Sequence, residues 1–550
     1  MLILRAGAVL AVFTLPLAAQ KTDCAQCHPD VVKALPASAH ATLGCVGCHP
    51  KYTEVPHPPR LGVPACADCH ATAAAQYATG AHGVARRAGD ESAPDCSVCH
   101  GGVHDVRAAA TAAFRQSIPE LCGACHPDVT KEYLESIHGK AFMAGNFDSP
   151  SCTACHGAHT EVPLLSRGQL GRPGIVRDTC ASCHADLRLA RRYSLPLTTV
   201  QSFDETFHGL ALKAGSLAVA NCGSCHGVHL VLPSSDPRSS VNQANLPATC
   251  GQCHPGAGSR FAIGTVHIVP GQEPPPVRLV RVAYAFLIPL LLGYMAVHHA
   301  GDLIRKLARL RLRATPVGPY PAPLPEPGAE VRMHHFERVA HALLIISFTV
   351  LAWSGFALIY PDTWWAWPLV TWEPAYPVRG VVHRAAAVLI LTVALAHGGS
   401  LILDRRLRRH WKTLWPRRKD VPEFVLNTAY NLGLRRDKPL VSSHSYIEKL
   451  EYWAVVWGTG IMAITGFLLW FNWYTLAALP KVWMDVAVAI HLFEATLATL
   501  AIIIWHFYMV IFDPEVYPMD PAWIHGVSVR RRIRESPEEE DQTPPPGAAP

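Results

Sequence analysis

The stretch Cys24-Ala25-Gln26-Cys27-His28 decides how the first half of this chain is interpreted. It is the first of nine Cys-x-x-Cys-His motifs, and the nine motifs together use all 18 cysteines of the 550-residue sequence. In such a motif the two thiols form thioether bonds to a porphyrin, and the histidine that follows binds the iron. The sequence therefore predicts nine covalently attached c-type haems.

The cysteines expected to attach haem are Cys24, Cys27, Cys45, Cys48, Cys66, Cys69, Cys96, Cys99, Cys122, Cys125, Cys152, Cys155, Cys180, Cys183, Cys222, Cys225, Cys250 and Cys253. The proximal histidines, one after each motif's second cysteine, are His28, His49, His70, His100, His126, His156, His184, His226 and His254. Zinc ribbons and disulfide frameworks also use paired Cys-x-x-Cys units, but neither requires these histidines.

Nine further histidines precede residue 276, which gives one spare imidazole for each predicted haem. The spare histidines are His40, His57, His82, His104, His138, His159, His208, His229 and His267. An iron held by two histidines has no open position for a substrate, so it can only accept and release electrons. We therefore expect mostly bis-histidine haems that carry electrons, with Met143 as a competing ligand.

The predicted haem region is internally repeated. Residues 122–159 and 180–229 follow the same order of motifs, and residues 24–57 and 66–104 are looser versions. Four two-haem units and a ninth haem account for the region. Because few long apolar segments lie between the motifs, we expect short helices and loops around the haems, with little regular sheet.

Composition divides the chain into five parts. Residues 1–19 resemble a secretory signal peptide, so the haem domain, residues 20–254, is expected in the periplasm. A Pro-rich linker, residues 255–279, precedes a predicted membrane domain, residues 280–512. Residues 513–550 form a predicted cytoplasmic tail that is disordered at its end. The net charge of +6 is spread over basic loops, so it gives no argument for nucleic-acid binding.

Five apolar runs have the length of membrane spans, so the fold class is mainly α. They cover residues 280–299, 339–360, 381–403, 452–473 and 486–512. The flanking segments 305–313 and 405–419 are rich in Arg and Lys, which is typical of cytoplasmic loops. An odd number of spans leaves the haem domain outside a bacterial inner membrane and the tail inside.

Histidines inside the spans predict two b-type haems. His491 and His506 are 15 residues apart on the last span, which places them about 22 Å apart along the axis and about 60° apart around it. His383 is expected level with His491, and His341 level with His506, so each pair would bind one haem. His397 is a rival to His341. A purely mechanical membrane anchor with hydrogen-bonded histidines is the alternative to both pairs.

Short motifs around these histidines resemble the formate dehydrogenase gamma-subunit and hydrogenase cytochrome b family. They are Arg338-Val339-Ala340-His341 followed by Ser354-Gly355, then Gly380-Val381-Val382-His383, Ile490-His491 and His506-Phe507-Tyr508-Met509. The resemblance implies two b haems that carry electrons across the membrane and a menaquinone site beside the cytoplasmic haem. The sequence departs from the family in the extra His397 and in one additional residue between His491 and His506.

The fusion of such a module to a nine-haem domain is similar to the CbcL-type inner-membrane quinol oxidoreductases of metal-reducing bacteria. The segment from Tyr446 to Trp453, ahead of Thr465-Gly466, also resembles that branch. Glu448 and Lys449 are expected beside His506 and are candidates for the quinone site. A solvated ion pair explains them equally well.

Other residues near the cytoplasmic side are open to two interpretations. His298 and His299 end the first predicted span, where a quinone contact and an interfacial position are equally compatible with the sequence. Asn431 and Gly433 resemble a quinone-contact motif of the formate dehydrogenase subunit, but they lie well upstream of the fourth span.

The expected function is menaquinol oxidation, with electrons passing through two b haems and nine c haems to periplasmic c-type cytochromes. The same parts would serve quinone reduction if electrons flowed inward. Two alternatives remain. One is a multihaem reductase of a small oxyanion, which would need a five-coordinate haem, and the other is the electron-transfer subunit of a larger respiratory complex.

Overall fold

The computed structural model describes residues 24–52, 57, 65–162, 175–259, 266–268, 272–312, 331–374, 376–439 and 444–528. The chain forms two compact units. The first unit comprises Met1–Gly171 and Val228–Leu232, and the second comprises Arg172–Gly227 and Pro233–Pro550. The predicted signal peptide and the end of the predicted tail lie outside the described residues.

The described part of the chain is helical, as predicted, and its one strand-like pairing is an isolated bridge between Val331 and Val527. The first unit contains α1 (Pro29–Ala34), α2 (Gly44–Cys48), α3 (Ala71–Thr79), α4 (Ala81–Arg87), α5 (Cys96–His100), α6 (Ala112–Gly123), α7 (Pro127–Glu135), α8 (Ile137–Met143) and α9 (Cys152–His156). Short 3-10 turns cover Cys24–Gln26, Leu35–Ala37, Ala41–Leu43 and Cys66–Asp68.

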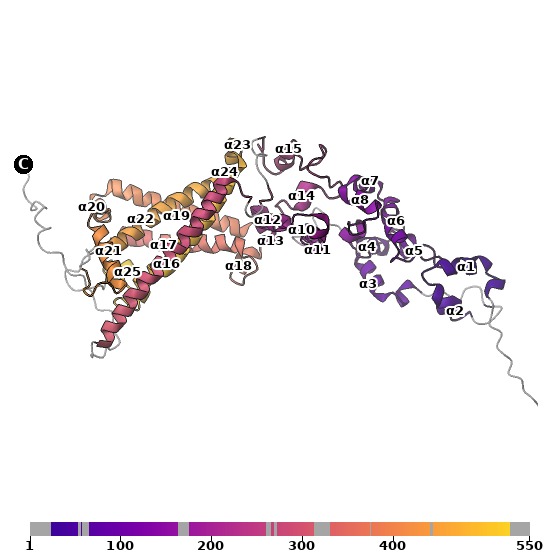
Figure 1. The fold of residues 1–550 in the computed structure, drawn as a ribbon, viewed down its shortest axis with the longest axis horizontal. Helices are drawn as coiled ribbons and strands as arrows, with labels where there is room; N and C mark the ends of the chain where they lie inside the picture. The colour runs from indigo at the N-terminus through magenta and orange to yellow at the C-terminus, as the bar shows by residue number, and fades with distance from the viewer. Residues whose placement is uncertain are drawn as a thin grey trace, which may run out of the picture. The chain divides into compact units, whose positions relative to one another are not determined.

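The second unit begins with short helices and continues with long ones (Figure 1). The short helices are α10 (Ile175–His184), α11 (Leu187–Tyr193), α12 (Thr198–Asp204), α13 (Phe207–Lys213), α14 (Cys222–His226) and α15 (Leu246–Gly251). The later elements are α16 (Pro275–Leu312), α17 (His335–Ile359), α18 (Trp367–Val370), α19 (Val378–Leu403), α20 (Arg405–Thr413), α21 (Asp420–Asn431), α22 (Tyr446–Trp470), α23 (Asn472–Ala478), α24 (Lys481–Ala501) and α25 (Ala522–His525), with π-helical turns at Ile502–His506 and Tyr508–Phe512.

Short helices of the cysteine-rich region pack closely because glycine follows a spare histidine at their starts. A Cβ on Gly139 of α8 would lie 2.0 Å from the Tyr133 carbonyl oxygen of α7, and one on Gly209 of α13 would lie 2.2 Å from the Phe203 oxygen of α12. Any side chain would therefore force these helix pairs apart. The repeated His-Gly dipeptide thus fixes the close approach of successive helices.

Five helices are long and apolar enough to cross a membrane, which confirms the predicted number of spans. They cover Pro275–Ala308, His335–Ile359, Val378–Leu403, Tyr446–Trp470 and Lys481–Phe512. At most 17% of the apolar window of any one of them is buried, so most of their apolar surface is left to face lipid or bound groups.

All five helices begin a few residues before the predicted spans, and two of the boundary differences have a clear local cause. α16 continues to Leu312 because Arg, Lys and Leu after the apolar run are strong helix formers. α22 begins at Tyr446, where Ser445 and Glu448 form a capping box that starts the helix ahead of the apolar run.

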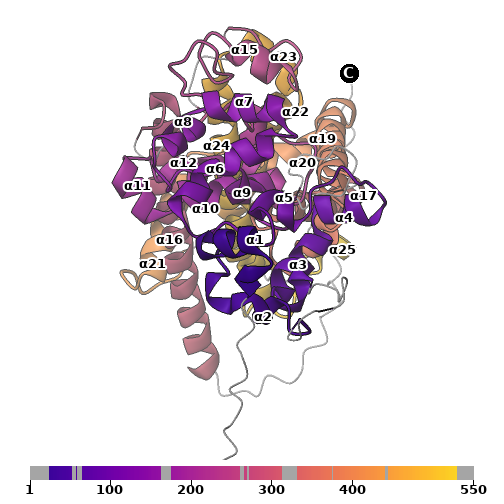
Figure 2. The same ribbon diagram turned by 90° about the vertical axis from the view of Figure 1, so that its right-hand side faces the viewer.

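Within the second unit, the long helices pack in pairs. α17 packs against α19, α22 packs against α24, and α16 packs against α24. Figure 2 shows α16 at one side of this bundle and α19 at the other. We call the end of the bundle that carries the Arg-rich helix α20 the basic end, and the other the opposite end.

Candidate haem and quinone sites

Several Cys-x-x-Cys-His motifs form a single helical turn with defined ends. In α5 the Asp95 side chain accepts hydrogen bonds from the first turn, and in α14 the Asn221 side chain does the same. Each turn ends at the proximal histidine, and the next residue is a glycine with positive φ, 92° at Gly101, 87° at Gly157 and 76° at Gly227. This backbone conformation favours glycine and turns the chain toward the next spare histidine.

Spare and proximal histidines of the first unit lie opposite each other in pairs. The ring centres are 6.1 Å apart for His28 and His57, 5.9 Å for His40 and His70, 6.2 Å for His49 and His104, 6.3 Å for His82 and His126, 6.2 Å for His100 and His159, and 6.2 Å for His156 and His229. An imidazole nitrogen binds a metal at about 2 Å and its ring centre lies about 1.15 Å behind it, so two imidazoles on opposite sides of one iron have centres about 6.3 Å apart. The observed spacings fit a haem iron between each pair.

The second unit contains two further pairs of the same kind. The ring centres of His208 and His254 are 5.9 Å apart, and those of His226 and His267 are 6.2 Å apart. Burial lowers the pKa of all four imidazoles. They are therefore neutral near pH 7, which is the form that binds metal.

The pairs cross between sequence repeats, a feature that the sequence left open. His40 of the first repeat faces His70 of the second, and His104 of the second faces His49 of the first. His159, in the third repeat, likewise faces the proximal histidine of the second. The repeats therefore interlock, because a proximal histidine in one commonly faces a spare histidine of its neighbour. Met143 ends α8 and is 42% exposed.

The long helices carry two histidine pairs at the same spacing. The ring centres are 6.4 Å apart for His383 and His491 and 6.3 Å apart for His341 and His506. These are the two pairings expected from the sequence. The Nε2 atom of His397 instead lies 2.9 Å from the Tyr452 hydroxyl, which gives this histidine a different partner.

Hydroxyl groups orient the pair at the opposite end of the bundle. The Ser354 Oγ donates to the Val350 carbonyl at 2.6 Å, so it accepts a hydrogen bond from His383 Nδ1 at 2.8 Å. Thr465 repeats this arrangement with His491, at 2.8 Å. With Nδ1 protonated in both rings, Nε2 is left as the metal-binding nitrogen.

At the basic end, a carboxylate takes the place of the hydroxyl. His506 Nδ1 lies 3.3 Å from Glu451 Oε1. His506 also ends the π-helical turn Ile502–His506, which follows α24 directly. A π-helical turn accommodates one more residue than an α-helical turn, so it absorbs the additional residue that separates His491 from His506. Both histidines can then face their partners, although an ideal α-helix would rotate them apart.

A family model described as prokaryotic cytochrome b561 matches residues 332–518. The C-terminal half carries a cytochrome b561 domain. This family implies b haems and membrane electron transfer, and the match covers all four histidines of the two membrane pairs. Neither the curated proteins nor the solved structures contain a match to the chain. The cysteine-rich region before the domain is not identified by these comparisons.

A buried polar cluster lies beside the cytochrome b561 domain's basic-end pair. His298 Nε2 lies 3.2 Å from the Tyr446 hydroxyl and 3.2 Å from the Asn431 amide nitrogen. His299 stacks on Tyr508 at 4.2 Å and contacts Trp505, the residue before His506, at 4.5 Å. The second half of α16 thus lies against the turn that carries His506.

Several polar atoms of this cluster are buried and, among the described residues, have no hydrogen-bond partner. They are both ring nitrogens of His299, Nδ1 of His298, Oδ1 of Asn431 and Nε1 of Trp505. Leaving one such atom unsatisfied costs about 1–3 kcal/mol. A ligand with oxygen atoms that both donate and accept hydrogen bonds fits this set.

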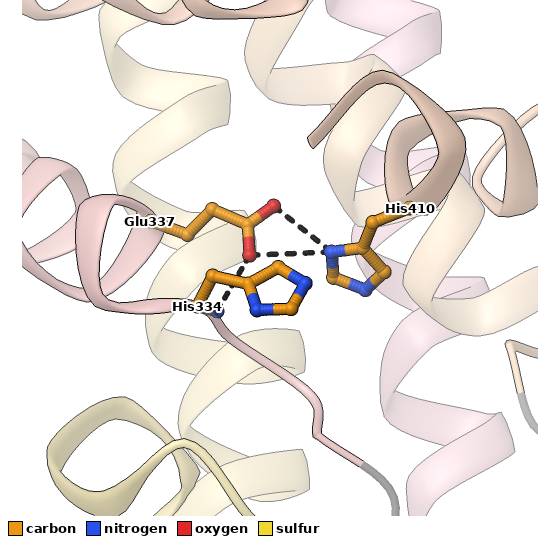
Figure 3. Close-up of side chains that lie close together, drawn as sticks. All are labelled: His334, Glu337 and His410. Atoms are coloured by element: carbon orange, nitrogen blue, oxygen red, sulfur yellow. Dashed lines mark hydrogen bonds and ion pairs between the residues drawn. The ribbon is translucent and has the colours of Figure 1, made fainter. Parts of the chain in front are cut away.

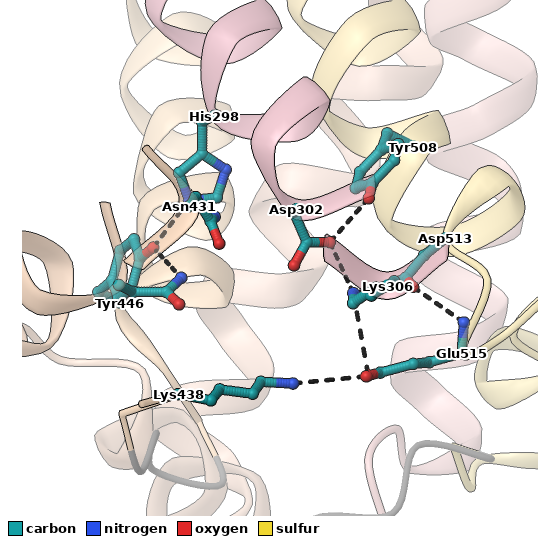
Figure 4. A network of polar contacts seen from close by, with 10 residues as sticks. His298, Asp302, Lys306, Asn431, Lys438, Tyr446, Tyr508, Asp513 and Glu515 are labelled. Atoms are coloured by element: carbon teal, nitrogen blue, oxygen red, sulfur yellow. Dashed lines mark hydrogen bonds and ion pairs between the residues drawn. The ribbon is translucent and has the colours of Figure 1, made fainter. Parts of the chain in front are cut away.

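A chain of charged groups continues from the cluster toward the basic end (Figure 4). The Tyr508 hydroxyl donates to Asp302 Oδ2 at 2.7 Å. Lys306 Nζ lies 2.6 Å from Asp302 and 2.8 Å from Asp513, and Glu515 follows at 3.9 Å. The Asp513 side chain is fully buried, whereas Glu515 is 47% exposed. The chain of charges therefore connects the buried cluster with solvent.

The two residues favoured for the quinone site have other partners. Glu448 accepts hydrogen bonds from the Ser445 backbone and hydroxyl and so caps α22. Lys449 is 4% exposed and pairs with Asp420 at 2.6 Å. Asn431, although distant in sequence from α22, comes to the cluster because α21 packs against α16. Gly433 lies just beyond α21 with a φ of 85°.

At the opposite end of the bundle, α13 packs on α17. Lys213 of α13 pairs with Asp362 at 2.8 Å. Burial lowers the pKa of His208, and repulsion from His254 and then from Lys481, the first residue of α24, lowers it further. The pair His208 and His254 therefore lies near the end of the bundle that holds His383 and His491.

Proposed function

We propose that the protein oxidises menaquinol near the cytoplasmic face of the inner membrane and passes the electrons outward to periplasmic c-type cytochromes. The observation that carries this proposal is the buried cluster of His298, His299 and Asn431 against Trp505, directly beside His506. Quinol oxidation needs groups that bind two hydroxyls, accept protons and lie next to an electron acceptor. The cluster offers all three.

The histidine pairs would hold the electron carriers. His383 with His491 and His341 with His506 would each bind one b haem, and the pairs in the cysteine-rich region would complete the covalently attached c haems. Between two imidazoles, haem iron would supply one-electron transfer without an open coordination position. Ser354, Thr465 and Glu451 would hold the rings in the orientation that leaves Nε2 for the iron.

The proton route follows from the residues of the cluster. A quinol hydroxyl would donate to a ring nitrogen of His299, whose neighbours are Tyr508 and Trp505. Asp302 lies one helical turn further along α16 and is linked to Tyr508, so it would receive the proton next. Lys306 and the carboxylates of Asp513 and Glu515 would then lead it to solvent at the basic end. A second proton would follow the same route after the second electron.

The opposite end supports a transfer from the membrane domain to the c-type motifs. α13 brings His208 to the end of the bundle that holds His383 and His491, and the Lys213–Asp362 ion pair fixes α13 there. If the basic end faces the cytoplasm, outward electron movement gains about 2.3 kcal/mol per electron per 100 mV of membrane potential.

Stopped-flow spectroscopy of the purified, oxidised full-length protein tests this function. Mixing with a menaquinol analogue is expected to reduce b-type absorbance first and c-type absorbance afterwards. In a His299→Leu variant, quinol-driven reduction is expected to slow at least about a hundredfold, because a proton acceptor is removed. Reduction by dithionite should be unchanged.

His335→Leu is the matched control, since His335 is exposed at the same end of the bundle. It should reduce at the wild-type rate. Equal rates of quinol-driven reduction in His299→Leu and His335→Leu would show that the quinone site lies elsewhere. Failure of quinol to reduce a wild-type protein that dithionite reduces fully would indicate a missing partner subunit or electron flow in the opposite direction.

A further inference from the structure

Two histidines and a glutamate converge at the basic end, away from the histidine pairs and the quinone cluster. His334 is the residue before α17, Glu337 lies in the first turn of α17, and His410 lies on α20. One donor atom from each of the three side chains lies within 4.8 Å of the other two (Figure 3). In this view dashed lines join the Glu337 carboxylate to the His410 ring and to the backbone nitrogen of His334.

Local structure holds the carboxylate in place. The backbone N–H of His334 donates to Glu337 Oε2 at 2.7 Å, which closes the start of α17. His410 Nδ1 lies 3.0 Å from Oε1 and 3.2 Å from Oε2 of the same carboxylate. The rings of His334 and His410 meet edge to face, with centres 5.2 Å apart and planes at 81°. This geometry differs from the spacing of about 6.3 Å that two imidazoles on one haem iron require.

Burial makes this cluster more than a surface ion pair. The side chains of His410 and Glu337 are 13% and 17% exposed. The Nε2 atom of His410 is buried and has no hydrogen-bond partner among the described residues. Only the other ring nitrogen, Nδ1, has a partner, which is Glu337. A third imidazole, His444, lies with its ring centre 5.5 Å from that of His410.

We propose that His334, Glu337 and His410 bind a divalent transition-metal ion of the Zn²⁺ type. Two imidazoles and one carboxylate are a common zinc ligand set, with water or another side chain in the fourth position. Ligand atoms around a tetrahedral zinc are about 3.3 Å apart, since each bond is about 2 Å long. His410 and Glu337 already meet this spacing, and rotation of the His334 ring closes the remaining gap.

Such a metal would join the start of α17 to α20, which follows the end of α19. It would therefore hold the α17 and α19 helix pair together at the basic end. It would be a structural site, because among the described residues no hydrogen bond or ion pair links His334, Glu337 or His410 to the quinone cluster or to the membrane histidine pairs. The proposal is therefore independent of the proposed quinol oxidation.

Zinc content of the full-length, haem-loaded protein tests this site. Protein without an affinity tag would be equilibrated with micromolar Zn²⁺, passed over a desalting column and measured by mass spectrometry for zinc and iron. We expect about one zinc per chain in the wild type. Glu337→Gln and His410→Gln should each lose zinc more than about tenfold, because even changes outside the ligand shell cost about 10- to 100-fold in affinity.

His335→Gln is the matched control, because His335 neighbours His334 in sequence but is exposed. It should keep its zinc. Zinc K-edge absorption spectroscopy is insensitive to haem iron and should show nitrogen and oxygen neighbours at about 2.0–2.1 Å. Retained b-type spectra in the variants would show that they are folded. Zinc content that is equally low in the wild type and in Glu337→Gln, or equally high in both, would overturn the proposal.

Discussion

The cytochrome b561 domain and the cysteine-rich region hold histidine pairs at nearly the same spacing by different means. Membrane pairs lie on long helices, and Ser354, Thr465 and Glu451 fix the ring nitrogen that faces away from the partner. Pairs in the cysteine-rich region lie on short helices and turns, and the members of several pairs come from different sequence repeats. The spacing is what an iron between two imidazoles requires, whereas the scaffold follows from the surroundings. In lipid the backbone must satisfy its own hydrogen bonds, as these helices do, and outside lipid covalent attachment can replace an extended scaffold.

The largest expected effect is loss of b haem from the membrane histidine pairs, which have no cysteines to hold a haem covalently. In His491→Leu and in His341→Leu, the b haem proposed for that pair would lose an axial ligand and would have no covalent bond to hold it. We expect haem b content to fall by about half in each variant if each pair holds one haem, as proposed. Pyridine haemochromogen assays measure this. His397→Leu is the control, because its imidazole contacts Tyr452 instead, and it should keep both b haems.

Removal of a histidine ligand in the cysteine-rich region should leave the haem attached but leave one axial position of its iron empty. His229 faces His156, whose motif would hold the haem by two thioethers. In His229→Ala we expect full haem c content and new binding of carbon monoxide by about one of the nine proposed c haems once it is reduced. Carbon monoxide difference spectra detect this. His525→Ala, outside the histidine pairs, should resemble the wild type, and loss of haem c in His229→Ala would contradict the comparison.

A smaller effect tests how the short helices pack. Gly139→Ala places a Cβ where the Tyr133 carbonyl lies 2.0 Å away, so α7 and α8 must separate. We expect this strain to destabilise the region by about 1–3 kcal/mol. Urea unfolding followed by c-haem absorbance measures the change. Gly258→Ala meets no atom closer than 3.9 Å and should have little effect.

The smallest expected effect concerns the hydroxyls of the membrane pairs. Ser354→Ala and Thr465→Ala remove the acceptors of His383 and His491, and we expect haem b affinity to fall by about 10- to 100-fold. Titration of haem into the haem-depleted protein measures this affinity. Thr392→Ala and Thr496→Ala are matched controls, because these exposed hydroxyls bond only to backbone carbonyls of their own helices. Equal losses in all four variants would show that the hydroxyls act on helix stability alone.

Sequence analysis predicted the five spans and the opposition of the two membrane pairs, because helical periodicity and motif spacing are local properties. It placed His491 and His506 about 60° apart on an ideal α-helix, since the additional residue between them does not reveal that a π-helical turn, which depends on packing, absorbs it. Asn431 was discounted for its distance from α22 along the chain. The structure brings it to His298 through the packing of α21 on α16, which no local pattern reveals.

The sequence also does not reveal which spare histidine of the cysteine-rich region faces which proximal histidine. Each of the nine is an equivalent candidate by sequence, and only the tertiary arrangement selects a partner. Glu448 and Lys449 show the reverse case. Their charge at a span boundary predicts a role in the quinone site, and the structure adds that Glu448 belongs to a capping box and Lys449 to a buried ion pair.

The interlocking of repeats has a consequence for how the protein is made. If the chain is exported from its N-terminus, as the proposed location of the haem domain requires, His49 emerges well before His104, the imidazole that faces it. A haem joined to that early motif would wait, half-ligated and reactive, until the next repeat emerged. Maturation would therefore advance in steps of one repeat, and a stalled or truncated chain would carry a haem open to oxygen at its growing end.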